Sequence, residues 1–489
     1  MADGIDKREL AVVLLVISSI FVALISLLPV FLTNDDTAYY ANSIIDLKPG
    51  WMDGKPIYIW IGHLVFWFAS LLGVSRPSLV FVFGAYSAFF GSLTGVNLYF
   101  IYRSIFNERY IGLTPALLTV FAPIGLTTSL LIAPYAVTVF FTTLAIAAWS
   151  NKRYLMWSLA WSMAICCHAS SLLLGIAWLG SLLASRDKNV AKKIAKHVPI
   201  IFFVCIVCFG WVLTFYPSLD YFLRFNAYVT QKDYLEPITE QWFTGRLQAL
   251  AQSSGLMLLI LSAVGTYFLD KRRSSDETIL LWWLAPYLLF YLFWPQAGGK
   301  FYIFCLPSLS MLASLGVRRL SSILRTVTGL GSTHLRFARP TSGFANILLI
   351  LLIVMGGLTQ GYGAVVELRM GPNEYSSAAL AINQWVTEEG ISSGILIISG
   401  WETHFIRFYS PGIKVVGWYG TLFPDTETQI ASLVLNTITR AQANHERVFV
   451  TRLWYFQEAS SDVRIALAAS TVVRHFEIVE TNEWLLEVV

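Results

Sequence analysis

The stretch LAVVLLVISSIFVALISLLPVFLTNDDTAYYANSIID, residues 10–46, decides how this chain folds. Residues 10–32 carry no charge, and a membrane-spanning helix needs about 20 apolar residues, so they predict a first span. Lys7 and Arg8 precede the run and no A-x-A cleavage pattern follows it, which favours a retained span over a signal peptide. Two adjacent carboxylates, Asp35 and Asp36, come directly after the span.

The composition of the whole chain is that of a polytopic membrane protein. Of its 489 residues, 56% are hydrophobic and only 13% are charged, with a mean hydropathy of +0.62. A soluble globular protein of this length does not sustain such values. The net charge of +4 is too small to suggest nucleic acid as a partner. All five cysteines lie in apolar runs, where thiols usually pack, and no further ligand accompanies the C-x-x-C of Cys205 and Cys208.

The apolar runs together predict about eleven membrane spans. We place them at residues 10–32, 78–101, 111–129, 134–150, 154–170, 171–185, 198–216, 247–269, 278–294, 301–316 and 342–360. Only the short stretch CCHASS separates the runs 154–170 and 171–185, so these could instead form two short or broken helices.

The distribution of Lys and Arg predicts the orientation of these spans. Basic segments follow alternate spans, at residues 103–109, 151–153, 186–197, 270–273 and 317–339. Cytoplasmic loops carry an excess of Lys and Arg, so we expect these five segments and the N-terminus in the cytoplasm, with the protein in the plasma membrane. The segments 33–77, 217–246 and 361–489 then lie on the extracytoplasmic face.

The apolar part of segment 33–77 is expected to lie along the membrane surface. Its sequence PIYIWIGHLVFWFASLLGVS carries Trp60, His63 and Trp67, and aromatic amphipathic side chains favour the interface. A second crossing there would also place every later basic segment on the wrong face.

Two domains are predicted: a membrane module over residues 1–360 and an extracytoplasmic α/β domain over 361–489. Short apolar segments predict strands at 394–400, 413–420, 447–453 and 476–489. Helical patterns occur at 374–389, 424–444 and 456–469. Glu402, His404 and Arg407 follow the first strand, but a capped short helix explains them.

Asp35 and Asp36 have two interpretations from local sequence. They could cap the helix that begins just after them, because carboxylates favour helix N-termini. One Asp would suffice for that. Two neighbouring acids tend to split their pKa values, which suits a catalytic base or a metal ligand better.

At this point the chain resembles the membrane-embedded GT-C glycosyltransferases, especially the branch with lipid A aminoarabinose transferases and protein O-mannosyltransferases. The resemblance rests on the order Asp35-Asp36, Tyr39 or Tyr40, Lys55-Pro56, Leu72-Gly73 and Arg76, and on GGKFYIFCLPSLSMLASLG at 298–316. The chain departs from the family pattern where Ile57 replaces a second Pro and where Lys300 replaces the more usual Arg. The stretch SLLIAPYAVTV, 129–139, also lacks an acidic residue often seen there.

The resemblance implies transfer of a sugar from a polyprenyl-phosphate donor to a lipid, glycan or protein acceptor. Because the leaving group is already a phosphate, no general acid is needed, unlike in glycosidases. Asp35 would be the base that deprotonates the acceptor, giving inversion. Asp36 would position the acceptor or hold a divalent cation such as Mg²⁺, Mn²⁺ or Ca²⁺. Lys55, Lys300 and Arg76 would bind the donor phosphate.

Further residues are expected to line the substrate cavity: Tyr39, Tyr40, His168, Arg224 and Asp233. Simpler roles remain open for several of them. His168 could form an interhelical hydrogen bond, the loop with Arg224 and Asp233 could be merely solvated, and the lysines could anchor helix ends. A transporter or flippase of polyprenyl-linked sugars is the alternative function, although such proteins usually carry charges within several spans.

Overall fold

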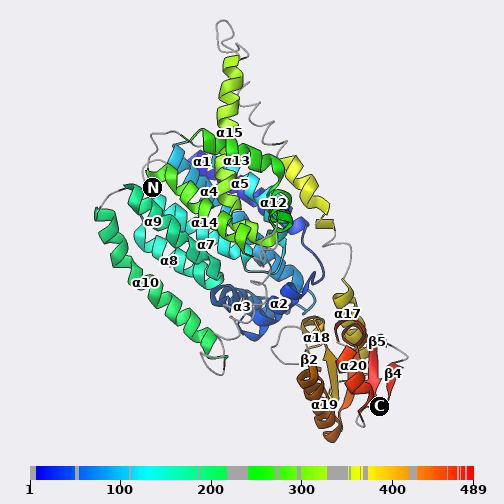
Figure 1. Ribbon diagram of the computed structural model, residues 1–489. Helices are drawn as coiled ribbons and strands as arrows, with labels where there is room; N and C mark the ends of the chain where they lie inside the picture. Colours follow the sequence, from blue (N-terminus) through cyan, green and yellow to red (C-terminus); the bar gives the residue numbers. More distant parts are fainter. Residues whose placement is uncertain are drawn as a thin grey trace.

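Two parts are visible in the computed structural model: a bundle of helices and, at one end of it, a small sheet flanked by helices (Figure 1). The structure describes residues 7–49, 54–108, 112–185, 188–216, 240–269, 275–294, 299–327, 351, 354–363, 365–366, 373–391, 393–417, 427–459, 461–470, 473, 475–479 and 482–489.

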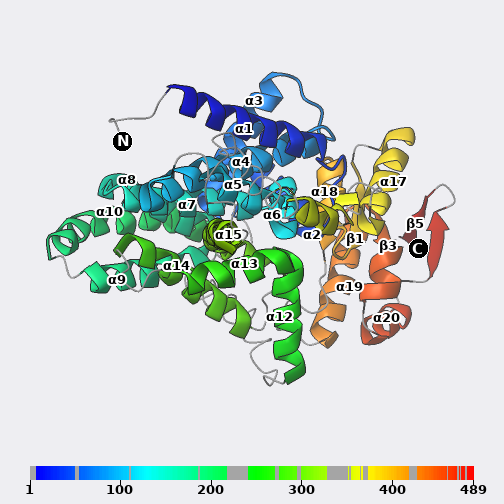
Figure 2. The same ribbon diagram turned by 90° about the horizontal axis from the view of Figure 1, so that it is seen from above.

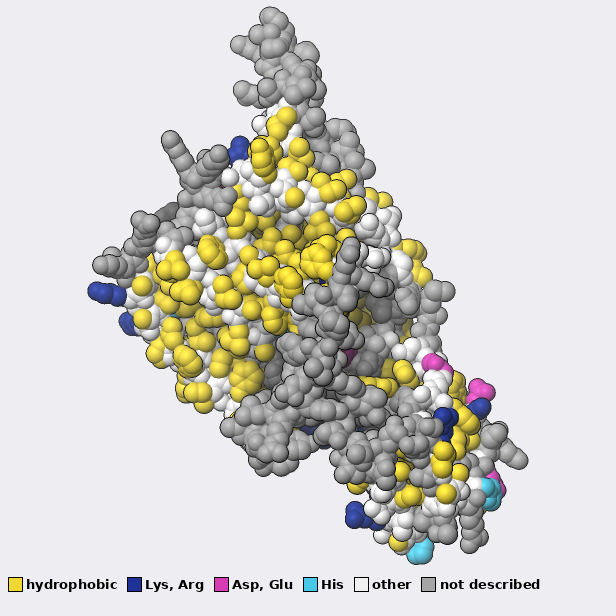
Figure 3. All heavy atoms as spheres, viewed as in Figure 1, with side chains coloured by type: hydrophobic (Ala, Val, Ile, Leu, Met, Phe, Trp, Pro, Cys, Tyr) yellow, Lys and Arg dark blue, Asp and Glu magenta, His cyan; other side chains and the backbone are white. Residues whose placement is uncertain are grey.

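The bundle has the helices of an integral membrane protein. Within the described residues, three helices are long and apolar enough to span a membrane: α1 (Lys7–Ser26), α4 (Leu79–Phe106) and α10 (Lys188–Leu213). Two bent helix pairs bring this number to five, and five shorter apolar helices accompany them. Hydrophobic side chains cover much of the visible bundle surface, as a lipid environment requires (Figure 3). The number of eleven spans stays a prediction.

Two of the predicted spans are broken rather than straight. Helices α5 (Leu113–Phe121) and α6 (Pro123–Leu130) meet at 72°, because Pro123 keeps Ala122 extended with ψ 148°. Helices α12 (Glu240–Ser254) and α13 (Leu256–Tyr267) meet at 96°, at Gly255 with a φ of +87°. The predicted spans 111–129 and 247–269 therefore correspond to bent pairs of helices.

The ambiguous region 154–185 forms two helices. The helix α8 (Tyr154–Cys167) ends at His168, a turn of 3-10 helix, η2 (Ala169–Leu173), follows, and α9 (Leu174–Ser185) continues. Packing around them comes from α7 (Tyr135–Ser150) on α8 and from α14 (Ser275–Phe293) on α9.

The helices α13 and α15 (Leu306–Val327) touch through glycine. A Cβ on Gly316 would collide with the Leu261 carbonyl oxygen, and one on Gly265 would collide with the Leu312 carbonyl. Small residues allow such close backbone approach between membrane helices.

Ion pairs join several of the basic segments that were predicted to share one membrane face. The side chain of Arg103 lies 3.1 Å from the buried Glu9, and Arg318 lies 2.6 Å from Glu108. The N-terminus and the far end of α15 both lie away from the C-terminal domain (Figure 1). This arrangement fits the predicted topology, while the side of the membrane stays a prediction.

The C-terminal domain is built on a five-stranded mixed sheet in the order β2-β1-β3-β5-β4. Strand β1 (Ile395–Ser399) pairs in parallel with β2 (Lys414–Gly417) and β3 (Arg447–Thr451). Strand β5 (Asn482–Val488) runs antiparallel to β3 and to β4 (Phe476–Val479). All four predicted strand segments are confirmed, and the last is a hairpin.

Helices cover both faces of this sheet, so β1 is buried along its whole length. Its Ile395 and Ile397 side chains share a core with α17 (Glu374–Glu388) and α18 (Thr403–Tyr409). Its Leu396 and Ile398 side chains share another core with α19 (Glu427–Ala443) and α20 (Ser461–Ala468). Figure 2 shows α17 on one side of the sheet and α19 with α20 on the other.

Candidate active site

The carboxylate pair opens the helix α2 (Asp35–Asp46), but neither carboxylate is its N-cap residue. The cap is Asn34, whose side chain accepts a hydrogen bond of 2.9 Å from the backbone N–H of Thr37. The Thr37 hydroxyl in turn accepts from the N–H of Asn34 at 3.2 Å, which completes a capping box. The capping interpretation of Asp35 and Asp36 is therefore wrong. The side chain of Asp35 lies outside the described residues.

Asp36 forms an ion pair with Lys300, which lies in the 3-10 turn η3 (Gly299–Phe304) just before α15. The ammonium donates to Oδ2 of Asp36 at 2.5 Å and lies 5.9 Å from the centre of the Tyr135 ring. Burial alone would lower the pKa of Lys300, but Tyr135 and Asp36 outweigh it and raise that pKa above its ordinary value. The side chains of Lys300 and Asp36 remain 42% and 29% exposed, so a substrate can reach the pair.

An aromatic wall with one histidine continues inward from this ion pair. The Tyr135 ring lies 5.9 Å from that of His168, which lies 5.1 Å from Phe304. The described hydrogen bonds of the buried His168 ring are to Ser170 in the same turn, to its hydroxyl at 2.7 Å and to its backbone N–H at 3.3 Å, rather than to another helix. The positive charges of Lys55 and Lys300 both act on His168. The structure therefore brings these three predicted residues to one region.

Lys55 is held in an unfavourable backbone conformation. It precedes the helix α3 (Pro56–Leu71) with a φ of 49° and a ψ of 44°, in the left-handed region that residues other than glycine rarely adopt. The neighbouring Gly54, at φ +74°, packs so closely on Val212 of α10 that an added Cβ would lie 2.5 Å away. Lys55 is only 6% exposed, which contradicts a snorkelling anchor. Backbone strain of this kind often accompanies functional positions.

The two tyrosines after the carboxylates face different surroundings. Tyr40 is buried, with its ring 5.6 Å from that of Tyr58 in the bundle core. Tyr39 instead packs edge-on against His404 of α18, with the ring centres 4.8 Å apart. Tyr39 thus lies where the C-terminal domain touches α2.

Arg76 also faces the C-terminal domain. Its guanidinium donates to the carbonyl oxygen of Arg407 at 3.3 Å and lies 5.7 Å from the centre of the Phe408 ring, both on α18. The role of Arg76 in donor binding stays a prediction. Arg224 and Asp233 lie outside the described residues.

Sequence reasoning missed a set of C-terminal residues that hold both flanks of the carboxylate pair. The Ser376 hydroxyl donates to the carbonyl oxygen of Leu32 at 2.7 Å, and the Asn373 amide donates to that of Thr33 at 3.0 Å. Farther along α2, the Asn42 amide donates to the His404 carbonyl at 2.7 Å. More than 300 residues separate the partners in each bond. No local signal in the sequence could have indicated them.

Among the residues that the structure describes, no metal site is apparent around Asp36. Hard divalent cations take several oxygen ligands, and within the described ranges no group of three or more His, Cys, Asp or Glu residues could hold a metal. Asp36 is instead paired with the ammonium of Lys300. Its metal-binding role therefore stays a prediction. Cys166 of α8 lies near Cys205 and Cys208 of α10, a third thiol beside the C-x-x-C that the sequence did not reveal.

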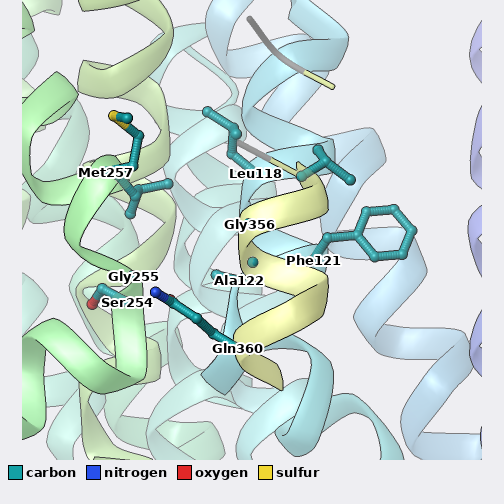
Figure 4. Close-up of a pocket in the computed structure, with 11 residues that line it drawn as sticks. Leu118, Phe121, Ala122, Ser254, Gly255, Met257, Gly356 and Gln360 are labelled. Carbon is teal, nitrogen blue, oxygen red and sulfur yellow. The ribbon is translucent and has the colours of Figure 1, made fainter. Parts of the chain in front are cut away.

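One apolar pocket of about 190 Å³ lies where the two helix breaks meet the helical residues 354–363 (Figure 4). The Gln360 side chain extends from that helix toward Ser254 and Gly255, and Leu118 and Met257 line the opposite part. None of the predicted site residues that the structure describes lines this pocket, so it is separate from the ion pair of Asp36 and Lys300.

The comparison with solved structures shows which fold this is. The chain superimposes on ArnT from Cupriavidus metallidurans bound to undecaprenyl phosphate with a TM-score of 0.69 and 13% identity, over 99% of this chain and 98% of that one. The match to the archaeal oligosaccharyltransferase AglB from Archaeoglobus fulgidus, in complex with an inhibitory peptide and a dolichol-phosphate, has a TM-score of 0.61 and 13% identity. It covers 98% of this chain and 74% of that one.

A third match is to the mycobacterial arabinofuranosyltransferase AftD, with a TM-score of 0.54 and 12% identity, over 92% of this chain and 35% of that one. No protein-family model matches the sequence, and neither does any curated protein. At these identities the likeness shows the fold alone. The GT-C fold, predicted from the order of residues in the first outer segment, is thereby confirmed.

Proposed function

We propose that this protein is a membrane glycosyltransferase that moves a sugar from a polyprenyl-phosphate donor to an acceptor on the extracytoplasmic face. The observation that carries the proposal is the ion pair between Asp36 and Lys300, which is accessible to substrate. Tyr135 lies between Lys300 and His168, and Lys55 lies near that histidine. This arrangement supplies a carboxylate for an acceptor hydroxyl beside cations for a donor phosphate, on a fold shared with ArnT and AglB. The donor class is carried over from the lipid phosphates named for those two structures.

The proposed reaction needs one base and two cations. The Asp35 carboxylate takes the proton of the acceptor hydroxyl while its oxygen bonds to the anomeric carbon. The bond from that carbon to the phosphate oxygen breaks on the opposite face, which inverts the anomeric configuration. The polyprenyl phosphate leaves with the bonding electrons, and the ammonium groups of Lys55 and Lys300 stabilise the charge that develops on it.

The ion pair adds an order to these events. Asp36 and Lys300 pair with one another at 2.5 Å. A donor phosphate offers Lys300 a stronger anionic partner, so its arrival draws the ammonium away and leaves the Asp36 carboxylate to accept a hydrogen bond from the acceptor. Donor binding would therefore prepare the acceptor position.

Native mass spectrometry of the detergent-purified protein tests the donor. The wild type should carry a polyprenyl phosphate or its glycosylated form, whose mass would identify the sugar. The double variant Lys55→Ala with Lys300→Ala should lose it, whereas Lys414→Ala, at an exposed lysine of the C-terminal domain, should not. A wild type that carries only bulk phospholipid and refuses added polyprenyl phosphates would remove the donor from the proposal.

Transfer itself is tested with the donor found in this way. Asp35→Asn should abolish transfer without lowering donor occupancy, because the amide cannot accept the proton. Full activity in Asp35→Asn would refute the assignment of the base. A cation at Asp36 predicts that EDTA stops transfer and that Mg²⁺, Mn²⁺ or Ca²⁺ restores it.

A further inference from the structure

A second pocket, of about 350 Å³, opens on the C-terminal domain between the start of α17, strand β5 and the π-helical turn η4 (Trp454–Glu458). This volume lies in the range of small-molecule sites, about 300–1,000 Å³. The side chains that line it combine two aromatic rings with hydrogen-bonding groups: Glu374, Arg452, Phe456, Gln457, Glu483 and Trp484. None of them belongs to the candidate active site.

The lining is held in place by contacts among its own members. The Arg452 guanidinium lies 5.9 Å from the centre of the Phe456 ring and donates to the carbonyl oxygen of Glu483 at 3.0 Å. The Gln457 amide donates to the Glu374 carboxylate at 3.2 Å. Such contacts reduce the entropy that a ligand must remove on binding.

The backbone that presents Phe456 and Gln457 is unusual. The turn η4 is π-helical, and the N–H of Ala459 donates to the carbonyl oxygen of Trp454 at 2.7 Å. π-helical turns are rare and are found frequently at functional sites. This one leaves the Phe456 side chain 55% exposed at the pocket. An exposed aromatic ring at a polar pocket is typical of a binding surface.

The charges of the lining restrict the class of ligand. Two carboxylates, on Glu374 and Glu483, oppose the single guanidinium of Arg452. Their excess negative charge disfavours a phosphate or carboxylate ligand. Aromatic rings with carboxylate and amide groups suit a pyranose, because its C–H face packs on a ring and its hydroxyl groups both donate and accept hydrogen bonds. A neutral or amine-bearing sugar therefore fits best.

The pocket lies next to the contact that supports the carboxylate pair. Glu374, on its wall, is the first residue of α17, and its neighbour Asn373 caps that helix. The same Asn373 donates to the carbonyl oxygen of Thr33, two positions before Asp35. A ligand in the pocket would thus lie on the side of the C-terminal domain that meets the start of α2.

From these observations we infer that this pocket binds a saccharide, neutral or amine-bearing, that forms part of the acceptor. The identification of the saccharide as the acceptor rests on the proposed function, whereas the binding of a saccharide does not. The pocket would hold a part of the acceptor away from the hydroxyl that reacts.

An array of immobilised mono- to tetrasaccharides, probed with the labelled full-length protein in detergent, tests saccharide binding. The wild type should bind neutral or amine-bearing glycans in preference to uronic acids. Phe456→Ala and Trp484→Ala should weaken this binding at least tenfold. Ile465→Ala removes a side chain that is 65% exposed on α20 of the same domain, outside the pocket, and should bind like the wild type.

A wild type that binds no glycan on the array, or pocket variants that bind as well as the wild type, would overturn the inference. Gln457→Ala changes an exposed side chain and serves where Trp484→Ala fails to fold. Thermal unfolding of each variant identifies such a failure.

Steady-state transfer separates this inference from the proposed function. Phe456→Ala should raise the acceptor KM at least tenfold and leave kcat and the donor KM unchanged, whereas Asp35→Asn should lower kcat. Glycan binding by a wild type that transfers nothing would refute the transferase and support the saccharide site. Active transfer with an unchanged acceptor KM in Phe456→Ala would refute the acceptor assignment.

Discussion

Asp36 and Lys300 contact one another at 2.5 Å although 264 residues separate them in the chain. The side chains of Lys300 and Asp36 are 42% and 29% exposed, and exposed ion pairs stabilise a fold by only about 0–1 kcal/mol. Stability alone therefore gives little reason for a cation to meet the carboxylate segment here. The proposed reaction, which handles both a hydroxyl and a phosphate, would give such a reason.

Removing either member of this pair should cost activity rather than stability. We expect Asp36→Asn and Lys300→Met each to lower transfer about 100-fold, or about 2.7 kcal/mol in barrier height, with a small change in the unfolding midpoint. Lys300→Arg, which keeps the charge, should stay within about tenfold of the wild type. Transfer rates beside thermal unfolding midpoints check this, and a large fall in the midpoint with unchanged transfer would contradict it.

The capping role of Asn34 and the proposed catalytic role of Asp35 should be distinguishable by experiment. Asn34→Ala removes the capping side chain and should lower stability by about 1 kcal/mol. Asp35→Asn leaves the capping box intact and should lower stability less, but it should remove nearly all transfer. Chemical denaturation and transfer assays on the two variants distinguish them. Equal effects of both substitutions on both readouts would mean that Asp35 acts through the helix rather than on the acceptor.

Because the backbone at Lys55 is left-handed, substitution by glycine and substitution by alanine should affect stability differently. Glycine adopts a φ of 49° without a steric penalty, whereas alanine does not, so Lys55→Gly should be more stable than Lys55→Ala by about 1 kcal/mol. Both variants lack the ammonium and should bind donor equally poorly. Donor occupancy by native mass spectrometry, beside unfolding midpoints, tests this. If donor occupancy changed with the stability of the two variants, and not with the loss of the ammonium, Lys55 would not be a ligand of the donor phosphate.

The sequence predicted the elements well because their signals are local. The alternation of strand and helix patterns predicted the α/β architecture of the C-terminal domain, and charge-free runs predicted most of the helices in the bundle. The breaks at Pro123 and Gly255 were missed because an apolar run has the same hydropathy whether the helix within it is straight or bent. Hydropathy measures composition, while a bend depends on the backbone at one residue.

The candidate site was predicted in part for the same reason. Asp36, Lys55 and Lys300 could be named from the order of residues in two segments, yet their contacts could not. The contacts of Asn373 and Ser376 with the backbone at Thr33 and Leu32 involve ordinary polar side chains. Such pairings depend on how the whole chain folds, and they cannot be predicted from a single sequence.

Loss of those contacts should impair catalysis without removing any group that touches substrate. Ser376→Ala leaves the buried Leu32 carbonyl without this partner, and Asn373→Ala does the same at Thr33, at a cost of about 1–3 kcal/mol each. We expect kcat to fall at least tenfold with the donor KM unchanged. Ser376→Thr keeps the hydroxyl and should recover part of the rate. Unchanged kcat in both alanine variants would show that the carboxylate segment holds its own position.

Acid should loosen the contact between the C-terminal domain and α2. Burial, with a contribution from Arg407, lowers the pKa of His404 from 6.5 to about 3. The unfolded chain therefore takes up this proton at a higher pH than the folded chain, and stability falls as the pH drops from about 6.5 toward 3. The loss reaches on the order of 2 kcal/mol at pH 5.

The pH dependence of the unfolding midpoint, followed by tryptophan fluorescence, tests this expectation. His404→Phe keeps a ring against Tyr39 but cannot be protonated, so the midpoint should change less between pH 7 and pH 5 than in the wild type. An identical slope in the variant would assign the acid sensitivity to other groups.

The hydrogen bonds from Asn373 and Ser376 also set a time order during biosynthesis. The ribosome makes the carboxylate segment near the beginning of the chain and its supporting residues about 340 positions later. Until then a nascent chain can insert its helices while Leu32 and Thr33 still lack these two partners. A message truncated before residue 373 would leave a protein in the membrane without this support, so these contacts with the carboxylate segment can form only after residues 373–376 have been made.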